Sequence, residues 1–578
     1  MPHFSAILSF YKQHRAECLC LLLFVVLALI GLVSHEITYD EAQSWQIART
    51  APWKDILLLV PMYEGHPPFW HLLLAGPAKL GASWHWVYGV IGFVCMVTSG
   101  CLLFFRAPFP RWVRCLLPFN FFLFYQYGII VRPYCIIVLL MLLLALYFPQ
   151  KDQRPGLFVG LLMGLCMCHL FGIAIAGGIT LAWLWQMRNA RAWKIYIPAL
   201  CKDKRFHYML GMLALVIFIV GIIVMPRGGE SFASTKPSSI WQQIIYVFLA
   251  MPADAVLTNL NAEITTYTKL LPWTNLLLTA CVGLVLWAMT LLFFPRKKIL
   301  FLVLPYICIG CVMLNYSSCH HIGLISLLFI WYLWITLAED APITKWPSIV
   351  NSLARGLLGL TLLVPIAWNI VSLYNDYRTV TFDGKPMVAF LQKYNLTDEV
   401  IFCAWEVLML HAKNDQATDK THVEYVTSPN MQPFALLFNV FTDHNMIANF
   451  NNGDKNTGYL KNRTVTEPQQ RAKIFEQWAT KGLPMVTLNV PALELVFGGE
   501  QDLTHLYRVS FLNNYYRLWK FDKERFPINI YLHENLWAKY GAQILADQGI
   551  TPTTASKPAA QPSAVHTPAQ NYTITIYR

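Results

Sequence analysis

Long apolar runs separated by short polar segments fill the first 372 residues of the chain. A membrane-spanning helix needs about 20 mainly apolar residues, and the pattern predicts eleven spans. They cover Leu19–Val33, 85–105, 112–128, 134–149, 156–171, 173–187, 207–225, 271–294, 299–314, 322–338 and 353–372. The apolar segment 67–80 is too short to cross a membrane. We therefore expect it to form a helix that dips into the membrane from the side of the preceding loop.

The pattern changes from Tyr374 onward, where polar residues dominate and helix-like and strand-like runs alternate. We predict helices at Val388–Tyr394 and Gln469–Thr480, and buried strands at Val400–Ala404 and Met485–Val490. The sequence thus predicts a polytopic α-helical membrane module over 1–372, with a first outer loop at 35–84. A soluble α/β domain over 373–550 follows, and the Pro-, Ala-, Ser- and Thr-rich end, 551–578, is predicted to be a flexible segment.

Composition supports a membrane protein. Hydrophobic residues make up 56% of the chain and charged residues only 13%, which excludes an ordinary soluble protein. The net charge of +12 would suit nucleic acid, but the basic residues lie in short loops between apolar runs, so we expect no nucleic-acid partner. Many of the 14 cysteines lie inside apolar runs, and we predict neither a disulfide framework nor a zinc site.

The placement of basic residues predicts the orientation of the spans. With the N-terminus inside and 67–80 not crossing, the inner loops hold 18 Lys and Arg residues and the outer loops before the last span hold seven. Basic residues mark the cytoplasmic side of a membrane. The bias therefore places the 35–84 loop and the C-terminal domain outside.

Unusual polar side chains gather at the helix ends predicted to face outside. They are Asp40 and Glu41 with His66 in the same loop, Arg132 beside Tyr134, His169, the His320–His321 pair, and Arg227 with Glu230. Each has a simpler alternative: acids cap helices, a single histidine is often an interfacial residue, and an arginine can snorkel to headgroups. The convergence of an acid, bases and arginines on one face suits chemistry on a lipid-linked phosphate.

These residues carry a resemblance. A first span, then Tyr-Asp-Glu-Ala at 39–42 with Trp45, then Gly-His-Pro-Pro-Phe-Trp at 65–70 and Arg-Pro-Tyr at 132–134, resembles the GT-C superfamily of integral-membrane glycosyltransferases. It is most similar to the branch of protein O-mannosyltransferases and bacterial lipid A glycosyl transferases. The resemblance covers roughly residues 10–340 and is specific in the first 150.

The resemblance implies a polyprenyl-phosphate sugar donor and assigns roles to residues. Asp40, with Glu41 beside it, matches the essential acid of the first outer loop, and Arg132 matches the arginine that contacts the donor phosphate. Pro133 intervenes where the family often has Arg-Tyr directly. His66 matches a structural or donor-positioning element, and His320 and His321 lie where relatives often place phosphate-binding residues. Tyr134 and Arg227 join the predicted phosphate-binding set, and Trp45 and His169 the positioning set.

We therefore expect transfer of a sugar to a lipid, glycan or protein acceptor by single displacement with inversion. Asp40 would be the general base, and Arg132, helped by Arg227 or a histidine, would hold the leaving phosphate. No cofactor is required, although the carboxylates and histidines could bind a divalent metal ion. We expect a multi-pass protein of the bacterial cytoplasmic membrane with its active site facing outside.

Two other classes of function fit parts of the pattern. A lipid or glycan transporter or flippase also has many spans, but it predicts ionisable residues near the middle of the membrane in interrupted helices. A catalytically silent scaffold, whose soluble domain binds a partner, is the third interpretation. The polar groups at outer helix ends favour an interfacial enzyme.

Overall fold

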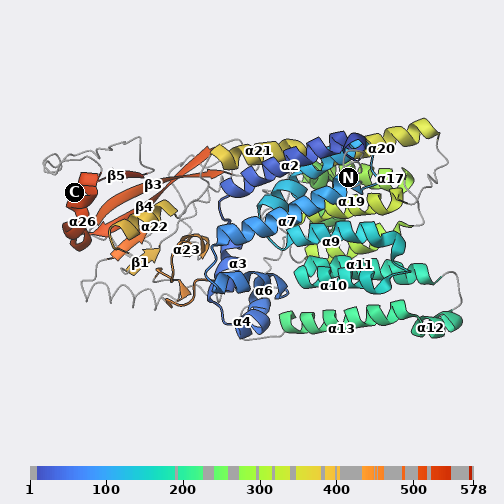
Figure 1. Cartoon of the computed structure of the whole chain (residues 1–578), viewed down its shortest axis with the longest axis horizontal. Coiled ribbons are helices and arrows are strands. Elements are labelled where there is room, and N and C mark those ends of the chain that lie inside the picture. The colour runs from blue at the N-terminus through green and yellow to red at the C-terminus, as the bar shows by residue number, and fades with distance from the viewer. Residues whose placement is uncertain are drawn as a thin grey trace, which may run out of the picture. The chain divides into compact units, whose positions relative to one another are not determined.

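A computed structural model covers the chain (Figure 1). It describes residues 10–64, 66–188, 193–224, 240–257, 273–293, 298–314, 319–338, 347–378, 385–396, 400–403, 432–447, 450–451, 454–460, 485–488, 506–516, 523–547 and 572–575. The chain divides into two compact units. Unit 1 comprises Met1–His35 and Trp53–Tyr377, and unit 2 comprises Glu36–Pro52 and Arg378–Arg578.

The described residues of unit 1 form helices and connecting turns, without strands. Its α-helices are α2 (Arg15–Ser34), α4 (Trp53–Leu58), α5 (Val60–Glu64), α6 (Phe69–Lys79), α7 (Trp84–Phe105), α8 (Arg111–Leu116), α9 (Tyr134–Tyr147), α10 (Pro155–Cys168), α11 (Leu170–Met187), α12 (Trp193–Cys201), α13 (Lys204–Val224), α14 (Ile240–Ile245), α15 (Met251–Leu257), α17 (Trp273–Phe293), α18 (Leu300–Met313), α19 (Gly323–Leu337), α20 (Ser348–Leu363) and α21 (Ile366–Arg378, its last residue assigned to unit 2). Short 3-10 turns are η1 (Leu117–Phe119), η3 (Phe148–Gln150) and η6 (Cys319–His321), and π-helices are η2 (Phe122–Ile129) and η4 (Tyr246–Ala250).

Six helical stretches in the described part of the chain are long and apolar enough to cross a membrane. They are Arg15–Ser34, Trp84–Phe105, Leu170–Met187, Ile240–Leu257, Trp273–Leu291 and Ser348–Tyr377. Shorter apolar helices cover Tyr134–Gln150, Pro155–Cys168, Leu300–Met313 and Gly323–Leu337. Helices α2, α7, α9, α10 and α11 pack successively against one another and lie side by side in Figure 1. This confirms a multi-pass helical membrane protein.

The structure differs from the predicted helices in three places. The predicted helix at 112–128 is divided into α8, η1 and η2, with Pro118 inside the 3-10 turn that interrupts the ladder. The break between the pair predicted at 156–171 and 173–187 falls at His169, whose extended backbone ends α10. The stretch Ile240–Leu257, not predicted as a span, is apolar and 18 residues long.

Close packing between α11 and α18 depends on a glycine. A Cβ atom at Gly178 would lie 2.3 Å from the Cα atom of Pro305, so no larger residue fits without a shift of backbone. Gly177, the preceding residue, has no atom within 4 Å of such a Cβ. Helices α11 and α18 therefore pack closely because one small residue lets two backbones approach each other.

Unit 2 contains α3 (Tyr39–Thr50), which we expected in the outer loop of the membrane module. The side-chain amide of Gln43 pairs with the backbone of Leu460: its Oε1 accepts from N–H at 2.9 Å and its Nε2 donates to the carbonyl at 3.2 Å. Arg49 donates to the carbonyl of Asn439 at 3.0 Å. These bonds explain why α3 belongs with the C-terminal residues.

A five-stranded sheet lies in unit 2. Its strands are β1 (Val400–Cys403), β2 (Met485–Leu488), β3 (Leu506–Tyr516), β4 (Lys523–His533) and β5 (Tyr572–Thr575), in the order β1-β2-β4-β3-β5. Strands β1 and β2 are parallel, with Val400 opposite Met485, and the other pairs are antiparallel. Strands β1 and β2 lie where the sequence predicted strands.

The helices of unit 2 besides α3 are α22 (Lys385–Lys393), α23 (Gln432–Asn439) and α26 (Glu534–Asp547). Helix α22 lies where a helix was predicted. At its end, Asp547 of α26 accepts hydrogen bonds from Lys393 and from the Tyr394 hydroxyl, both at 2.8 Å. The predicted helix 469–480 and residues 551–571 of the predicted flexible segment 551–578 lie outside the described residues. Residues 572–575 of that segment are not flexible but form β5, which pairs with β3.

Candidate functional site

Four histidines and an arginine from separate segments of unit 1 form one cluster, which we call the histidine cluster. His66 precedes α6, His169 separates α10 from α11, and His320 and His321 form part of η6 before α19. The rings of His66 and His169 lie 4.2 Å apart between centroids, those of His320 and His321 4.1 Å, and those of His169 and His321 5.9 Å. The structure thus brings together residues that the sequence placed at separate helix ends.

Arg132 joins the cluster between η2 and α9. Its Nη1 lies 3.1 Å from Nε2 of His320. Since a guanidinium can only donate, Nε2 accepts, and the single ring proton of His320 is on Nδ1. The guanidinium also lies over the ring of Tyr134, 5.2 Å from its centroid. The positive charge of the cluster is therefore carried by Arg132, and His320 supplies a neutral ring with one N–H donor.

His169 is also held in one tautomer. Its Nδ1 accepts from the backbone N–H of Phe171 at 3.1 Å, because His169 caps the N-terminus of α11. The ring proton is then on Nε2, which lies 3.0 Å from the hydroxyl oxygen of Tyr134. The Nε2–H group of His169 therefore donates to that oxygen.

The cluster has a partly exposed edge and a buried layer. Arg132, His66 and His320 are half-buried, whereas Tyr134, His169 and His321 are each 1% exposed. A ligand from outside would meet the first three side chains. Tyr134 belongs to the buried layer, and its predicted role in binding phosphate stays a prediction.

Tyr127 of the π-helix η2 supports the cluster, and sequence analysis did not single it out. Its hydroxyl donates to the backbone carbonyl of His320 at 2.6 Å, and its ring stacks on Tyr134 with centroids 5.0 Å apart. Residues 118–127 are rich in aromatics and look like ordinary core, so little in the sequence marks Tyr127. The π-helical winding, which is common at functional sites, is visible only in the structure.

The predicted acid pair lies in α3 of unit 2, and its two members differ. Oε2 of Glu41 accepts from the backbone N–H of Thr38 at 2.8 Å and from the Thr38 hydroxyl at 2.7 Å. Glu41 is 1% exposed and completes a capping box. Asp40 is half-buried in the first turn of α3, and Trp45 is buried on the same helix.

Two predicted site features remain, Arg227 and the divalent metal ion. Arg227 lies outside the described residues. Within the described residues, no three His, Cys, Asp or Glu side chains are arranged to hold a metal ion. The option of a divalent metal ion stays a prediction.

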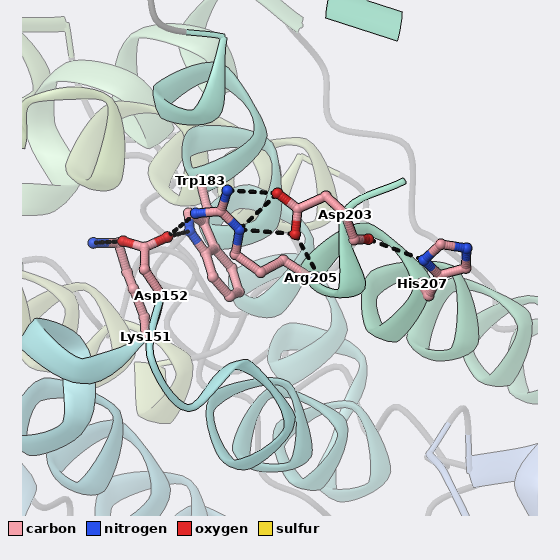
Figure 2. A network of polar contacts seen from close by, with 6 residues as sticks. All are labelled: Lys151, Asp152, Trp183, Asp203, Arg205 and His207. Carbon is pink, nitrogen blue, oxygen red and sulfur yellow. Dashed lines mark hydrogen bonds and ion pairs between the residues drawn. The ribbon is translucent and has the colours of Figure 1, made fainter. Parts of the chain in front are cut away.

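A second polar cluster lies at the other end of α10, a helix about 21 Å long at 1.5 Å per residue. Figure 2 shows Arg205 between Asp152 and Asp203, with ion pairs to both. Trp183 Nε1 donates to Asp152 at 3.1 Å. Hydrogen bonds from Arg205 lower the pKa of Asp203. This cluster ties the loop before α10 to the start of α13, and we assign it a structural role.

The charges around Asp152 explain its ionised state. Burial raises the pKa of Asp152. The hydrogen bond from Trp183, the positive charge of Lys151 and hydrogen bonds from Arg205 and Lys151 outweigh that effect and lower the pKa. Lys151 Nζ lies 3.2 Å from Asp152. The loop before α10 is therefore held by a charged side chain at neutral pH.

Two further carboxylates of unit 1 were not singled out from the sequence. Asp254 of α15 is fully buried and accepts from the Tyr246 hydroxyl at 2.9 Å. Asp376 of α21 accepts from the Tyr125 hydroxyl at 2.8 Å and lies 3.5 Å from His35 Nδ1. A carboxylate inside an apolar run, as in residues 246–257, was the available signal for Asp254.

No model of a known protein family matches this chain, and no curated protein matches it. The GT-C resemblance therefore stays a prediction from the motifs.

Proposed function

We propose that this protein is a membrane glycosyltransferase that takes its sugar from a polyprenyl-phosphate donor. The observation that carries the proposal is the histidine cluster, where Arg132 is held on Nε2 of His320 at a partly exposed position. A guanidinium can grip two phosphate oxygens at once, and the Nδ1–H group of His320 adds a donor. This is a donor set suited to an anionic lipid headgroup.

The chemistry then needs few groups. Departure of the polyprenyl phosphate from the anomeric carbon places growing negative charge on the phosphate oxygens, which Arg132 and the histidine N–H groups stabilise. Asp40 accepts the proton of the attacking acceptor hydroxyl. One displacement breaks the bond between sugar and phosphate and forms the new glycosidic bond, with inversion.

The histidine cluster also supports the predicted topology of the first spans. His66 and His169 are in contact, so they lie on one side of the membrane, and an even number of crossings must separate them. Helix α7, the stretch from α8 to η2, helix α9 and helix α10 supply four. Helix α6 then crosses zero times, as expected for an 11-residue dipping helix.

The same parity applies to the later spans. His169 and His321 are neighbours, so an even number of crossings separates α11 from η6. Helices α11, α13, α17 and α18 supply four. In this topology Ile240–Leu257 enters and leaves on one side, consistent with its interruption by the π-helix η4 and by Pro252. The eleven predicted spans and their orientation thereby stay in the proposal.

The decisive assay is transfer of a labelled sugar from a polyprenyl-phosphate donor by the purified full-length protein. Wild type should transfer label to a lipid, glycan or protein acceptor, and Asp40→Asn should lower the rate by ~10²-fold or more, the usual scale for a general base. Asp55→Asn, which changes a carboxylate in α4 of unit 1, is the control and should retain the wild-type rate. Failure of wild type with every donor sugar tested would refute the proposal.

A lipid or glycan transporter is the second candidate, and one observation favours it. Asp254 is a buried carboxylate in an interrupted helix, which is typical of transport pathways. Proteoliposomes containing the protein separate the two functions. A transporter would move labelled lipid-linked sugar across the membrane and lose that activity in Asp254→Asn, while forming no new glycosidic bond.

A further inference from the structure

The guanidinium of Arg132 contacts two side chains that help to position it. One contact is with the acceptor nitrogen of His320, 3.1 Å away, and the other is with the ring face of Tyr134. A cation on an aromatic face is attracted by the ring quadrupole, and the attraction depends on where the ring lies. The position of the Tyr134 ring therefore helps to set the position of the charge.

The Tyr134 ring is contacted by His320 and His321, with centroids 5.8 and 6.1 Å away, and by Tyr127 and His169. Tyr127 stacks on it at an interplanar angle of 25°, and His169 donates its Nε2–H to the Tyr134 hydroxyl oxygen. This hydrogen bond requires that the proton of His169 be on Nε2. The backbone N–H of Phe171, by donating to Nδ1, imposes that tautomer.

We propose that His169 is a positioning residue that sets the donor-binding geometry of Arg132 through the Tyr134 ring. The inference rests on the proposed function, in which Arg132 binds the phosphate of the lipid donor. His169 and Tyr134 are both 1% exposed, so they act from beneath the ligand-facing edge. The N-terminus of α11 thus fixes the tautomer of His169. That tautomer orients the Tyr134 side chain, and the Tyr134 ring helps to position the guanidinium of Arg132.

His169 could instead matter only as the cap of α11, and two substitutions separate the roles. In His169→Asn, the short amide can keep its acceptor oxygen near the place of Nδ1, so the cap survives while the bond to Tyr134 is lost. In His169→Gln, the longer amide can place an N–H donor near the place of Nε2, so the bond to Tyr134 survives while the cap weakens. Tyr134→Phe removes the hydroxyl and leaves the cap intact.

The experiment measures binding of a short-chain polyprenyl monophosphate to the full-length protein in nanodiscs, with the matching polyprenol as control ligand and thermal unfolding as the folding control. Wild type should prefer the phosphate to the alcohol. His169→Asn and Tyr134→Phe should each bind the phosphate about fivefold more weakly, the scale of one hydrogen bond, with unchanged unfolding temperature. His169→Gln should bind within about twofold of wild type but unfold at a lower temperature.

The outcomes distinguish failure of the proposed function from failure of the positioning role of His169. If wild type binds the alcohol as tightly as the phosphate, the proposed function fails and this inference fails with it. If wild type prefers the phosphate while His169→Asn and Tyr134→Phe both bind it like wild type, the positioning role is refuted and the proposed function stands. Should His169→Asn fail to fold, Tyr134→Phe decides the question alone.

Discussion

Glu41 and Asp40 are adjacent carboxylates, and the structure predicts opposite effects when each is changed. Glu41 is buried and accepts two hydrogen bonds from Thr38, so it holds the first turn of α3. Glu41→Ala removes both of these hydrogen bonds, and each is worth about 1 kcal/mol. We therefore expect Glu41→Ala to lower the local stability of α3 by about 2 kcal/mol.

Substitution by glutamine should be much milder. A glutamine oxygen at the same helix position also closes a capping box, so Glu41→Gln should lower the stability of α3 by less than about 1 kcal/mol. Neither change should alter the rate of sugar transfer by protein that remains folded. Asp40→Asn should do the reverse, with unchanged stability and a greatly reduced rate.

Hydrogen exchange of the α3 amides, measured by mass spectrometry on full-length protein, reports this local stability. A loss of about 2 kcal/mol corresponds to exchange about 30-fold faster in Glu41→Ala than in wild type. The reasoning is wrong if Glu41→Ala exchanges at the wild-type rate, or if Glu41→Gln is destabilised as much as Glu41→Ala. It is also wrong if Glu41→Gln abolishes transfer while its α3 remains protected.

Two further predictions concern packing and charge. Gly178→Ala should destabilise unit 1 by about 1–3 kcal/mol, the range for overpacking, because its Cβ would meet the backbone of Pro305. The control Gly177→Ala has open space around its Cβ and should leave the unfolding temperature of the detergent-solubilised protein unchanged. Arg205→Gln should lower that temperature at pH 6, and the deficit should shrink as pH falls below 3.8. The pKa of Asp203 in the folded protein lies below its ordinary value of 3.8, so the stabilisation by its ion pair with Arg205 is complete above pH 3.8 and is lost as pH falls through the folded pKa. A difference in unfolding temperature that does not depend on pH would contradict this.

Helix positions followed from the sequence where apolar runs were long and uninterrupted. Helices α7, α17 and α19 begin and end within two residues of the predicted bounds. The sequence did not predict that 112–128 is divided into α8, η1 and η2, because apolarity alone does not distinguish a regular helix from a series of short helical turns that bury the same side chains. It also did not predict the helical stretch Ile240–Leu257, where Gln242, Gln243 and Asp254 lower the apolar signal and about half of the residues are buried inside the protein.

The candidate site was predictable as a set of residue types but not as an arrangement. Histidines and an arginine at several helix ends indicated one face of the membrane. The contact between Arg132 and His320, residues 188 positions apart, depends on how α9 and α19 pack. The tautomer of His169 depends on a backbone N–H two residues along, which becomes a donor only because α11 begins there. The role of Glu41 as a cap was one of the alternatives that the sequence left open.

The most direct test of the account is the transfer rate measured against donor concentration for Arg132→Ala and Arg132→Lys. Removing a hydrogen bond to a charged group costs about 1.5–3 kcal/mol, which corresponds to about tenfold to hundredfold. We predict that Arg132→Ala lowers transfer at limiting donor by that factor, with Arg132→Lys between it and wild type because an ammonium keeps the charge but loses the bidentate grip. The control Arg106→Ala, at an exposed helix end, should match wild type, and the solubilised yield of all three should be equal. Wild-type dependence on donor concentration in Arg132→Ala would contradict the account.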